Sequence, residues 1–369
     1  MNRLFRWDQM GLFLLALAAG ILPFAVPEVC AAALREGLTL CSGPLLLSLF
    51  PFLVVSRLLV QCPESDLLAL PFRLAAWGIG IRTPCAARVL CIGFLGGFAP
   101  AASAAAQAVR TGQLTAEEAD ALLPACICSG PSFVVLTVGQ SLLGSAELGV
   151  LLFAAQITAN YLTAALLNRF AGVHSVEQRP AAPASPAPPR LDEILADAAI
   201  TYCKLCGFIL FFRMLAAGAG ALLPAGAGTL CSILLEVCSG CDLASRTGRW
   251  GSLLCCAALS VQGLSVLLQV RTICPPEMTL RPLYRARMLH LPLSLALFYL
   301  LLPGGEADVF STLPARVLLM RRVPPDCALL VFAVCCMAAC TLRSGIRQVE
   351  QKQMARNAGG CCINSKTLL

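Results

Sequence analysis

Polar residues that interrupt long apolar runs are the part of this sequence most able to do chemistry. The stretch ACICSGPSFVVLTVG (125–139) would read as one apolar helix if Ser129, Gly130 and Pro131 did not stand in its middle. In hydrocarbon an unsatisfied backbone group is costly, so irregular backbone survives only in packed protein or beside a wet cavity. A helix that restarts after such a break points N–H groups and a partial positive charge into the space before it. We therefore expect a solute site here, preferably for an anion; a kink that only allows close helix packing is the alternative.

Three charged residues lie where lipid is expected. Lys204 and Arg213 belong to YCKLCGFILFFRM, and Glu236 belongs to CSILLEVCSG. A charge at mid-bilayer costs about 2.5–3.5 kcal/mol on insertion scales, so such residues face a cavity or a partner. We expect them to contact a substrate or an ion, with Lys204 or Arg213 balancing the charge of an anion. In the alternative, Arg213 reaches the membrane surface and Lys204 pairs with Glu236 for structural reasons alone.

Binding, and not catalysis, is the chemistry that these residues favour. Gln262, Ser265 and Gln269 follow one another at helical spacings, so they share a face and need partners in a helix, water or a ligand. An enzyme would need a nucleophile beside a base, and the chain has only His174 and His290. With no nucleotide-binding motif either, we expect neither an enzyme nor a cofactor.

The elements that must position these residues are membrane helices. The chain is 58% hydrophobic and 13% charged, with a mean hydropathy of +0.79, whereas about one quarter of a soluble domain is charged. Runs such as 11–26, 39–60, 148–167 and 291–302 approach the roughly 20 apolar residues of a crossing, and we expect roughly eight spans, some of them broken or re-entrant. The net charge of +7 is scattered over short loops, which favours membrane lipid and excludes nucleic acid as a partner.

The order of segments predicts two membrane halves. Arg3 and Arg6 before the first run indicate an uncleaved signal anchor with a cytoplasmic N-terminus, and positive charge places the linker and tail in the cytoplasm too. Prolines in VHSVEQRPAAPASPAPPR remove any apolar periodicity. The expected parts are the anchor and connector (1–38), a first half (39–170), a linker (171–191), a second half (192–302), a loop and C-terminal membrane helix (303–343) and a basic tail (344–369).

The two halves carry matching interruptions. In the first, the glycine-rich GFLGGFAP precedes a polar helix and then the break at Ser129 and Gly130. In the second, LLEVCSGCD precedes LSVQGLSVLLQV, in which Gln262 and Gly263 occupy the equivalent place. Such repeated breaks are typical of transporters that hold their substrate where the broken helices meet.

Other charges and the cysteines are expected to have plainer roles. Thr115 with Glu118 predicts a capping box opening a helix in water, whose charges form a solvated face. Arg57 is expected to anchor its span at the membrane surface. Most of the 21 cysteines lie in apolar runs, where they act as small apolar residues; the pairs 203–206 and 238–241 lack the further ligands of a metal site.

Five stretches together resemble a known family. They are FPFLVVSRLL (50–59), GFAPAASAAAQAVRTGQLTAEEADALL (97–123), SGPSFVVLTVG (129–139), LLEVCSG (234–240) and GLSVLLQV (263–270). In order and spacing they are similar to the YlbJ (SpoVV) family of sporulation integral membrane proteins, whose Gate domains resemble those of concentrative nucleoside transporters. The resemblance extends over about 43–302. This chain has Gly130 where the family has asparagine and Leu267 where it has histidine.

The resemblance implies an all-helical membrane fold of two Gate-like halves and the export of dipicolinic acid from the mother cell across the outer forespore membrane. The expected binding residues, some from the breaks and some from the family motifs, are Gly97, Phe98, Ser129, Gly130, Pro131, Ser132, Lys204, Arg213, Glu236, Ser239, Gly240, Gln262, Gly263, Ser265 and Gln269. Two alternatives stay open: a non-transporting scaffold for spore cortex assembly, and a nucleoside-type permease. The sequence leaves any coupling ion, the direction of transport and homo-oligomer formation open.

Overall fold

The computed structural model describes residues 5–61, 67–171 and 191–302, and within them all regular structure is helical. The elements are α1 (Phe5–Ala25), α2 (Pro27–Ser42), α3 (Pro44–Gln61), α4 (Leu70–Gly78), α5 (Pro84–Gly96), α6 (Phe98–Arg110), α7 (Ala116–Cys126), the π-helical η2 (Ser132–Leu142), α8 (Ala146–Ala171), α9 (Leu191–Leu222), α10 (Ala225–Leu235), α11 (Val237–Ser245), the short η3 (Gly248–Trp250), α12 (Gly251–Val261), α13 (Gly263–Ile273) and α14 (Arg281–Leu301). Arg3, the linker between 172 and 190, the C-terminal membrane helix and the basic tail lie outside the described residues.

Several helices are long and apolar enough to cross a bilayer. In the described ranges these are α8, α9 and the stretch Gly248–Ile273, which comprises η3, α12 and α13, and a fourth span if the bent pair of α1 and α2 counts as one. The chain is therefore a helical membrane protein. Helices such as α5, η2 and α10, with 13, 11 and 11 residues, fall short of the roughly 20 of a full crossing. The count of roughly eight membrane segments stays a prediction.

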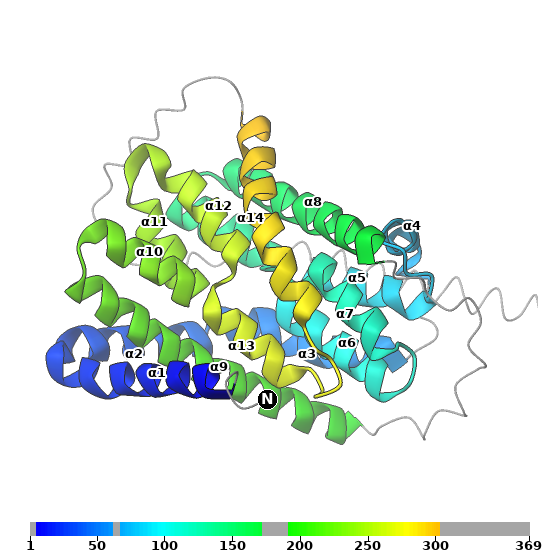
Figure 1. The fold of residues 1–369 in the computed structure, drawn as a ribbon, viewed down its shortest axis with the longest axis horizontal. Helices are drawn as coiled ribbons and strands as arrows, with labels where there is room; N and C mark the ends of the chain where they lie inside the picture. The colour runs from blue at the N-terminus through cyan, green and yellow to red at the C-terminus, as the bar shows by residue number, and fades with distance from the viewer. Residues whose placement is uncertain (1–4, 62–66, 172–190, 303–369) are drawn as a thin grey trace, which may run out of the picture.

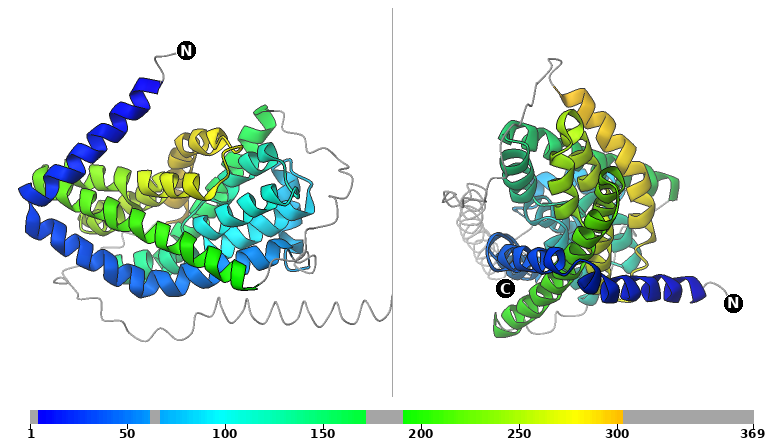
Figure 2. Two further views of the ribbon diagram at one scale, coloured as in Figure 1. Left: turned by 90° about the horizontal axis from the view of Figure 1, so that it is seen from below. Right: turned by 90° about the vertical axis from the view of Figure 1, so that its left-hand side faces the viewer.

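Long helices enclose shorter ones. α8 and α9 run along opposite sides of the bundle (Figure 1), and α2 packs along α9. At Val26 the chain bends by 110°, so α1 leaves the body at an angle to α2 (Figure 2). Pro27 occupies the first position of α2, where its missing N–H costs no hydrogen bond. The apolar run expected over 11–26 thus ends at this bend, between Ala25 and Pro27.

The centre of the bundle is built on small side chains. α6 reads FAPAASAAAQAVR and is buried along most of its length, from Ala99 to Ala106. It contacts α3, α5, α7 and α13. Because alanine lets backbones approach closely, one short helix can be surrounded by four others. The described cysteines are mostly buried as well, in keeping with the small apolar role expected of them.

The capping box at the start of α7 is confirmed. Thr115 Oγ1 accepts a hydrogen bond from Glu118 N at 3.0 Å, and the Glu118 carboxylate accepts one from Thr115 N at 2.9 Å. The expectation that all charges of this helix face solvent is wrong for Asp120, which is buried. Its carboxylate accepts hydrogen bonds from Thr279 N (2.8 Å) and Leu280 N (3.2 Å) and so fastens the loop before α14 to α7. The Asp120 carboxylate faces inward because its hydrogen-bond donors belong to this loop, which is distant in the sequence.

We expect Asp120→Ala to lower the free energy of unfolding by about 2–3 kcal/mol, because hydrogen bonds to a charged group are lost and the buried N–H of Leu280 loses its acceptor. The change should show as a lower melting temperature of the purified protein in detergent. Glu117→Ala, on the exposed face of the same helix, should change stability by no more than about 0.5 kcal/mol. Equal effects of the two substitutions would contradict the role given to Asp120.

Candidate functional site

The first interruption is the one-residue turn at Gly97 between α5 and α6. The two helices fold back on each other, so that a Cβ on Gly93 would lie 3.2 Å from Ala101 Cβ. Gly97 has φ 80° and ψ −163°, and a Cβ there would lie 2.7 Å from Gly130 N. Only glycine adopts this backbone readily. The absence of a side chain therefore lets the turn rest directly on the second interruption.

The second interruption separates α7 from η2. Pro131 has no N–H, so the Ile127 carbonyl cannot find its helical partner four residues on. Asn160 Nδ2 (3.3 Å) and Arg287 Nη2 (2.8 Å) donate hydrogen bonds to that carbonyl instead. η2 then begins at Ser132, and no described side chain caps it. The Ser-Gly-Pro break is thus supported by polar residues of α8 and α14.

The third interruption is the turn at Glu236 between α10 and α11. These helices also fold back on each other, since a Cβ on Gly240 would lie 2.8 Å from Ile233 Cα. The Glu236 carboxylate accepts hydrogen bonds from Cys238 N (2.9 Å) and Ser239 N (2.7 Å). A carboxylate at this position accepts hydrogen bonds from N–H groups that a helix start leaves free. Its negative charge also interacts favourably with the positive end of the helix. The N-terminus of α11 is therefore already occupied by its own side chain.

The fourth interruption, between α12 and α13, contacts both the second and the third interruption. Gln262 has φ 66°, a left-handed conformation, and Gly263 follows with φ 71°. A Cβ on Gly263 would lie 3.0 Å from Glu236 N, so this break rests on the turn of α10 and α11. Gln262 Nε2 donates hydrogen bonds to Leu259 O (2.7 Å) and, more weakly, to Ser129 Oγ (3.4 Å). All four interruptions meet at one place.

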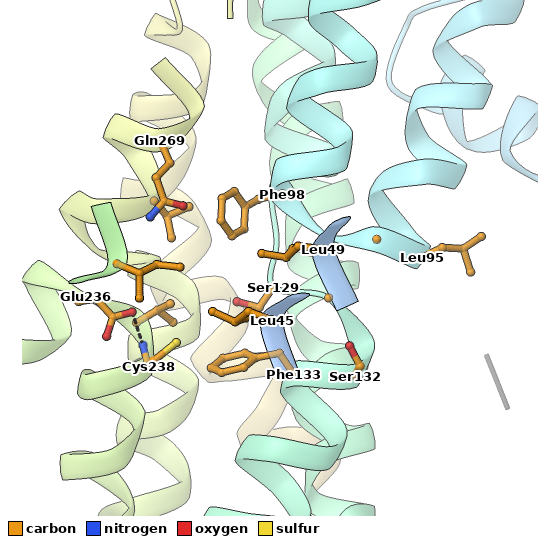
Figure 3. A pocket seen from close by; sticks show the side chains of 15 residues that line it. Leu45, Leu49, Leu95, Phe98, Ser129, Ser132, Phe133, Glu236, Cys238 and Gln269 are labelled. Carbon is orange, nitrogen blue, oxygen red and sulfur yellow. Dashed lines mark hydrogen bonds between the residues drawn. The ribbon is translucent and has the colours of Figure 1, made fainter. Parts of the chain in front are cut away.

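A pocket opens where they meet. Its cavity volume is about 70 Å³, smaller than the roughly 300–1,000 Å³ of sites for drug-sized ligands. It is lined by Leu45, Leu49, Leu95, Gly96, Phe98, Ser129, Gly130, Ser132, Phe133, Ile209, Glu236, Val237, Cys238, Val266 and Gln269. Figure 3 shows Glu236, Cys238 and Gln269 on one side and Phe98, Ser129, Ser132 and Phe133 on the other.

Few polar groups line the pocket, and one of them, Gln269, has an oxygen atom without a hydrogen-bond donor among the described residues. Glu236 is the only charged residue among the described residues that line it. Gln269 is 2% exposed; its Nε2 donates to Ser265 Oγ at 2.9 Å, while its Oε1 has no hydrogen-bond partner in the described part of the chain. Buried polar atoms are nearly always paired, so an exception beside a pocket is a place for a solute donor.

The residues expected to form the site fall into three groups. Those that line the pocket are Phe98, Ser129, Gly130, Ser132, Glu236 and Gln269. Those that shape the interruptions or support a lining residue are Gly97, Pro131, Ser239, Gly240, Gln262, Gly263 and Ser265. Lys204 and Arg213 do not line the pocket.

The charged residues of α9 are placed differently from the expectation. Lys204 is exposed, because the neighbouring Tyr202 and Leu205 occupy the buried face of the helix. Arg213 forms an ion pair with Glu36 of α2 at 2.7 Å. Lys204 is therefore not positioned to balance a charge in the pocket. Arg213 does not line the pocket either, but it interacts electrostatically with Glu236 and Cys238, which do. Lys204 does not pair with Glu236, whose carboxylate binds backbone N–H groups.

Arg57 has a partner that the expectation of a surface anchor did not include. Its side chain is buried and forms an ion pair with Asp197 of α9, whose side chain is 62% exposed, so a position at the membrane surface stays a prediction. The pair joins α3 to α9. A partner 140 residues away in the chain, which the sequence does not reveal, holds the guanidinium in place.

Reasoning from the sequence missed two kinds of site residue. Leu45, Leu49 and Ile209 line the pocket from α3 and α9, but nothing distinguishes them from other apolar residues in a membrane helix. Asn160 and Arg287 support the second break from behind. An amide in the middle of the apolar run 148–167 was the available signal, since a polar group in hydrocarbon needs a partner.

Comparison with models of protein families, with characterised proteins and with solved structures gives no match to this chain. Fold and site together define a helical membrane protein with a pocket at the junction of interrupted helices.

Proposed function

We propose that this protein is a secondary transporter that carries a small organic solute across a membrane and binds it in the pocket between the four interruptions. The observation that supports the proposal most is their meeting at one pocket. Interrupted backbone is costly in a membrane unless it is packed or lines a cavity. A protein that only recruits partners, the scaffold alternative, has no need of four such interruptions around a pocket.

The order of elements supports an internal repeat. α5 and α6 turn at one residue and precede the interrupted pair of α7 and η2; α10 and α11 turn at one residue and precede the interrupted pair of α12 and α13. Transporters built of repeats place their substrate between such broken helices and move one part against the other. The proposal therefore includes two related halves, with further membrane segments completing the roughly eight spans.

The resemblance to the YlbJ family makes dipicolinate the first solute to test, with the outer forespore membrane as the location. No described side chain caps α6, η2 or α13, so the positive ends of these helices support binding of carboxylates. The apolar lining, with Phe98 and Phe133, suits the faces of a ring.

One observation favours a second candidate solute. Glu236 is the only charged residue among the described lining residues, and neither Lys204 nor Arg213 lines the pocket. A pocket whose lining carries a carboxylate and no cation is better suited to a neutral solute that donates hydrogen bonds. A nucleoside-type solute therefore stands beside dipicolinate.

Solute binding to the purified protein in detergent, measured by calorimetry, tests this proposal. We expect dipicolinate to bind, and we expect Gln269→Ala and Ser129→Ala each to weaken binding about tenfold, which corresponds to about 1.4 kcal/mol and to the loss of one hydrogen bond. Lys204→Ala, which changes an exposed charge, should leave the affinity unchanged. Binding of uridine in place of dipicolinate would move the assignment to the neutral solute. Wild-type affinity in both Gln269→Ala and Ser129→Ala would show that the solute does not bind in this pocket.

A further inference from the structure

Arg287, in the second turn of α14, is a buried cation that does not line the pocket. Its side chain is nearly inaccessible, with the residue 7% exposed, and it forms no ion pair with a carboxylate among the described residues. Its Nη2 donates to Ile127 O at 2.8 Å and to Asn160 Oδ1 at 3.3 Å, and its Nη1 donates to Ser260 O at 3.3 Å. A charge buried in this way calls for an explanation.

The two carbonyls that it binds belong to equivalent places in the two interrupted helices. Ile127 directly follows α7, and Ser260 lies in the last turn of α12. Pro131 deprives the first carbonyl of its helical partner, and the left-handed Gln262 interrupts the hydrogen-bond ladder beyond the second. One guanidinium therefore binds a carbonyl at the end of each half-helix.

The same arrangement explains how Arg287 is stabilised without a carboxylate partner among the described residues. The C-terminal end of a helix carries roughly half a negative charge, so two such ends together offset about one positive charge. Asn160 completes the arrangement, because its Nδ2 donates to Ile127 O while its Oδ1 accepts from Arg287. The charge of Arg287 is thus compensated by backbone that the interruptions leave free.

We propose that Arg287 is a positioning residue that joins the C-terminal ends of α7 and α12 and so fixes the second and fourth interruptions relative to each other. Both acceptors lie two residues before the side chains that meet across the halves, Ser129 and Gln262, which are 3.4 Å apart. A guanidinium that spans both carbonyls holds these residues in register at the pocket. The effect on solute binding rests on the proposed function; the positioning of the interruptions does not.

Amide hydrogen exchange of the full-length protein in detergent, followed by mass spectrometry, tests the positioning role without a solute. Arg287→Lys keeps the positive charge but carries its donors on one nitrogen, so it cannot span both carbonyls. We expect exchange to accelerate at least tenfold in peptides covering both interruptions, 127–134 and 260–266, and to stay unchanged in α1 and α2. Arg285→Lys, at an exposed position of the same helix, is the matched control and should change neither region.

A second variant keeps the test decisive if the first does not fold. Asn160→Ala removes a contact to Ile127 O but none to Ser260 O, so exchange should rise at 127–134 and not at 260–266. Unchanged exchange at the interruptions, or a uniform rise throughout the chain, would overturn the proposal. In the binding measurement with dipicolinate and uridine, Arg287→Lys should lower the affinity for whichever solute binds the wild type about tenfold. If neither solute binds the wild type, the proposed function fails while the exchange result still decides the role of Arg287.

Discussion

Replacing Gly97 with alanine is expected to lower the free energy of unfolding by about 2–5 kcal/mol and to abolish solute binding. Its backbone conformation, φ 80° and ψ −163°, is open to almost no residue but glycine. In addition, the new Cβ would lie 2.7 Å from Gly130 N, which belongs to backbone that cannot move aside as a side chain can. Thermal unfolding in detergent and solute binding on the same sample measure the two effects.

Gly112 provides the matched control for Gly97. It also has a positive φ, 70°, but a Cβ there would meet nothing within 4 Å. Gly112→Ala therefore carries backbone strain alone, about 1–2 kcal/mol, and should retain solute binding. Gly263→Ala, where a Cβ would lie 3.0 Å from Leu235 O, should behave like Gly97→Ala. If Gly97→Ala were no more harmful than Gly112→Ala, the close contact of the interruptions would be refuted.

Removing the carboxylate of Glu236 has the second large effect. We expect Glu236→Ala to lower the free energy of unfolding by about 2 kcal/mol or more, because the partly buried Cys238 N and Ser239 N lose a charged acceptor at the start of a helix. Glu236→Gln should cost less, since one oxygen can still accept. Thermal unfolding measures both. Asp242→Ala, on the same helix and in the exposed ion pair with Arg246, should change stability by less than about 1 kcal/mol.

Glu236→Gln also separates the two candidate solutes. A carboxylate in the pocket repels an organic dianion, so the dipicolinate assignment predicts that its affinity is kept or increased in this variant. A neutral solute that donates a hydrogen bond to Glu236 would instead bind about tenfold more weakly. Destabilisation by Glu236→Ala no greater than by Asp242→Ala would show that the carboxylate does not cap α11.

The interruptions could be located from the sequence because their causes are local. Pro131 lacks a donor, glycine at 97 and 263 permits a positive φ, and a carboxylate such as Glu236 satisfies the start of a helix. Each of these properties belongs to a residue and its near neighbours. The capping box at Thr115 was predictable for the same reason.

The directions of charged side chains were not predictable, because they depend on distant partners. Arg213 binds Glu36, 177 residues earlier in the chain, and Asp120 binds the loop at Thr279, 159 residues later. α9 is apolar around most of its surface, so its sequence did not reveal that Lys204 lies on the exposed face. The family, the substrate and the number of membrane segments stay predictions.

Transport by the wild-type protein in liposomes tests the central claim most directly. The purified protein is reconstituted, and uptake of labelled dipicolinate and of labelled uridine is followed against liposomes without protein. We predict saturable uptake of one of the two solutes, and we expect it to be dipicolinate. Excess unlabelled solute should suppress this uptake, and Gly97→Ala should abolish it. Uptake of both solutes no faster than into protein-free liposomes would contradict the account of a transporter.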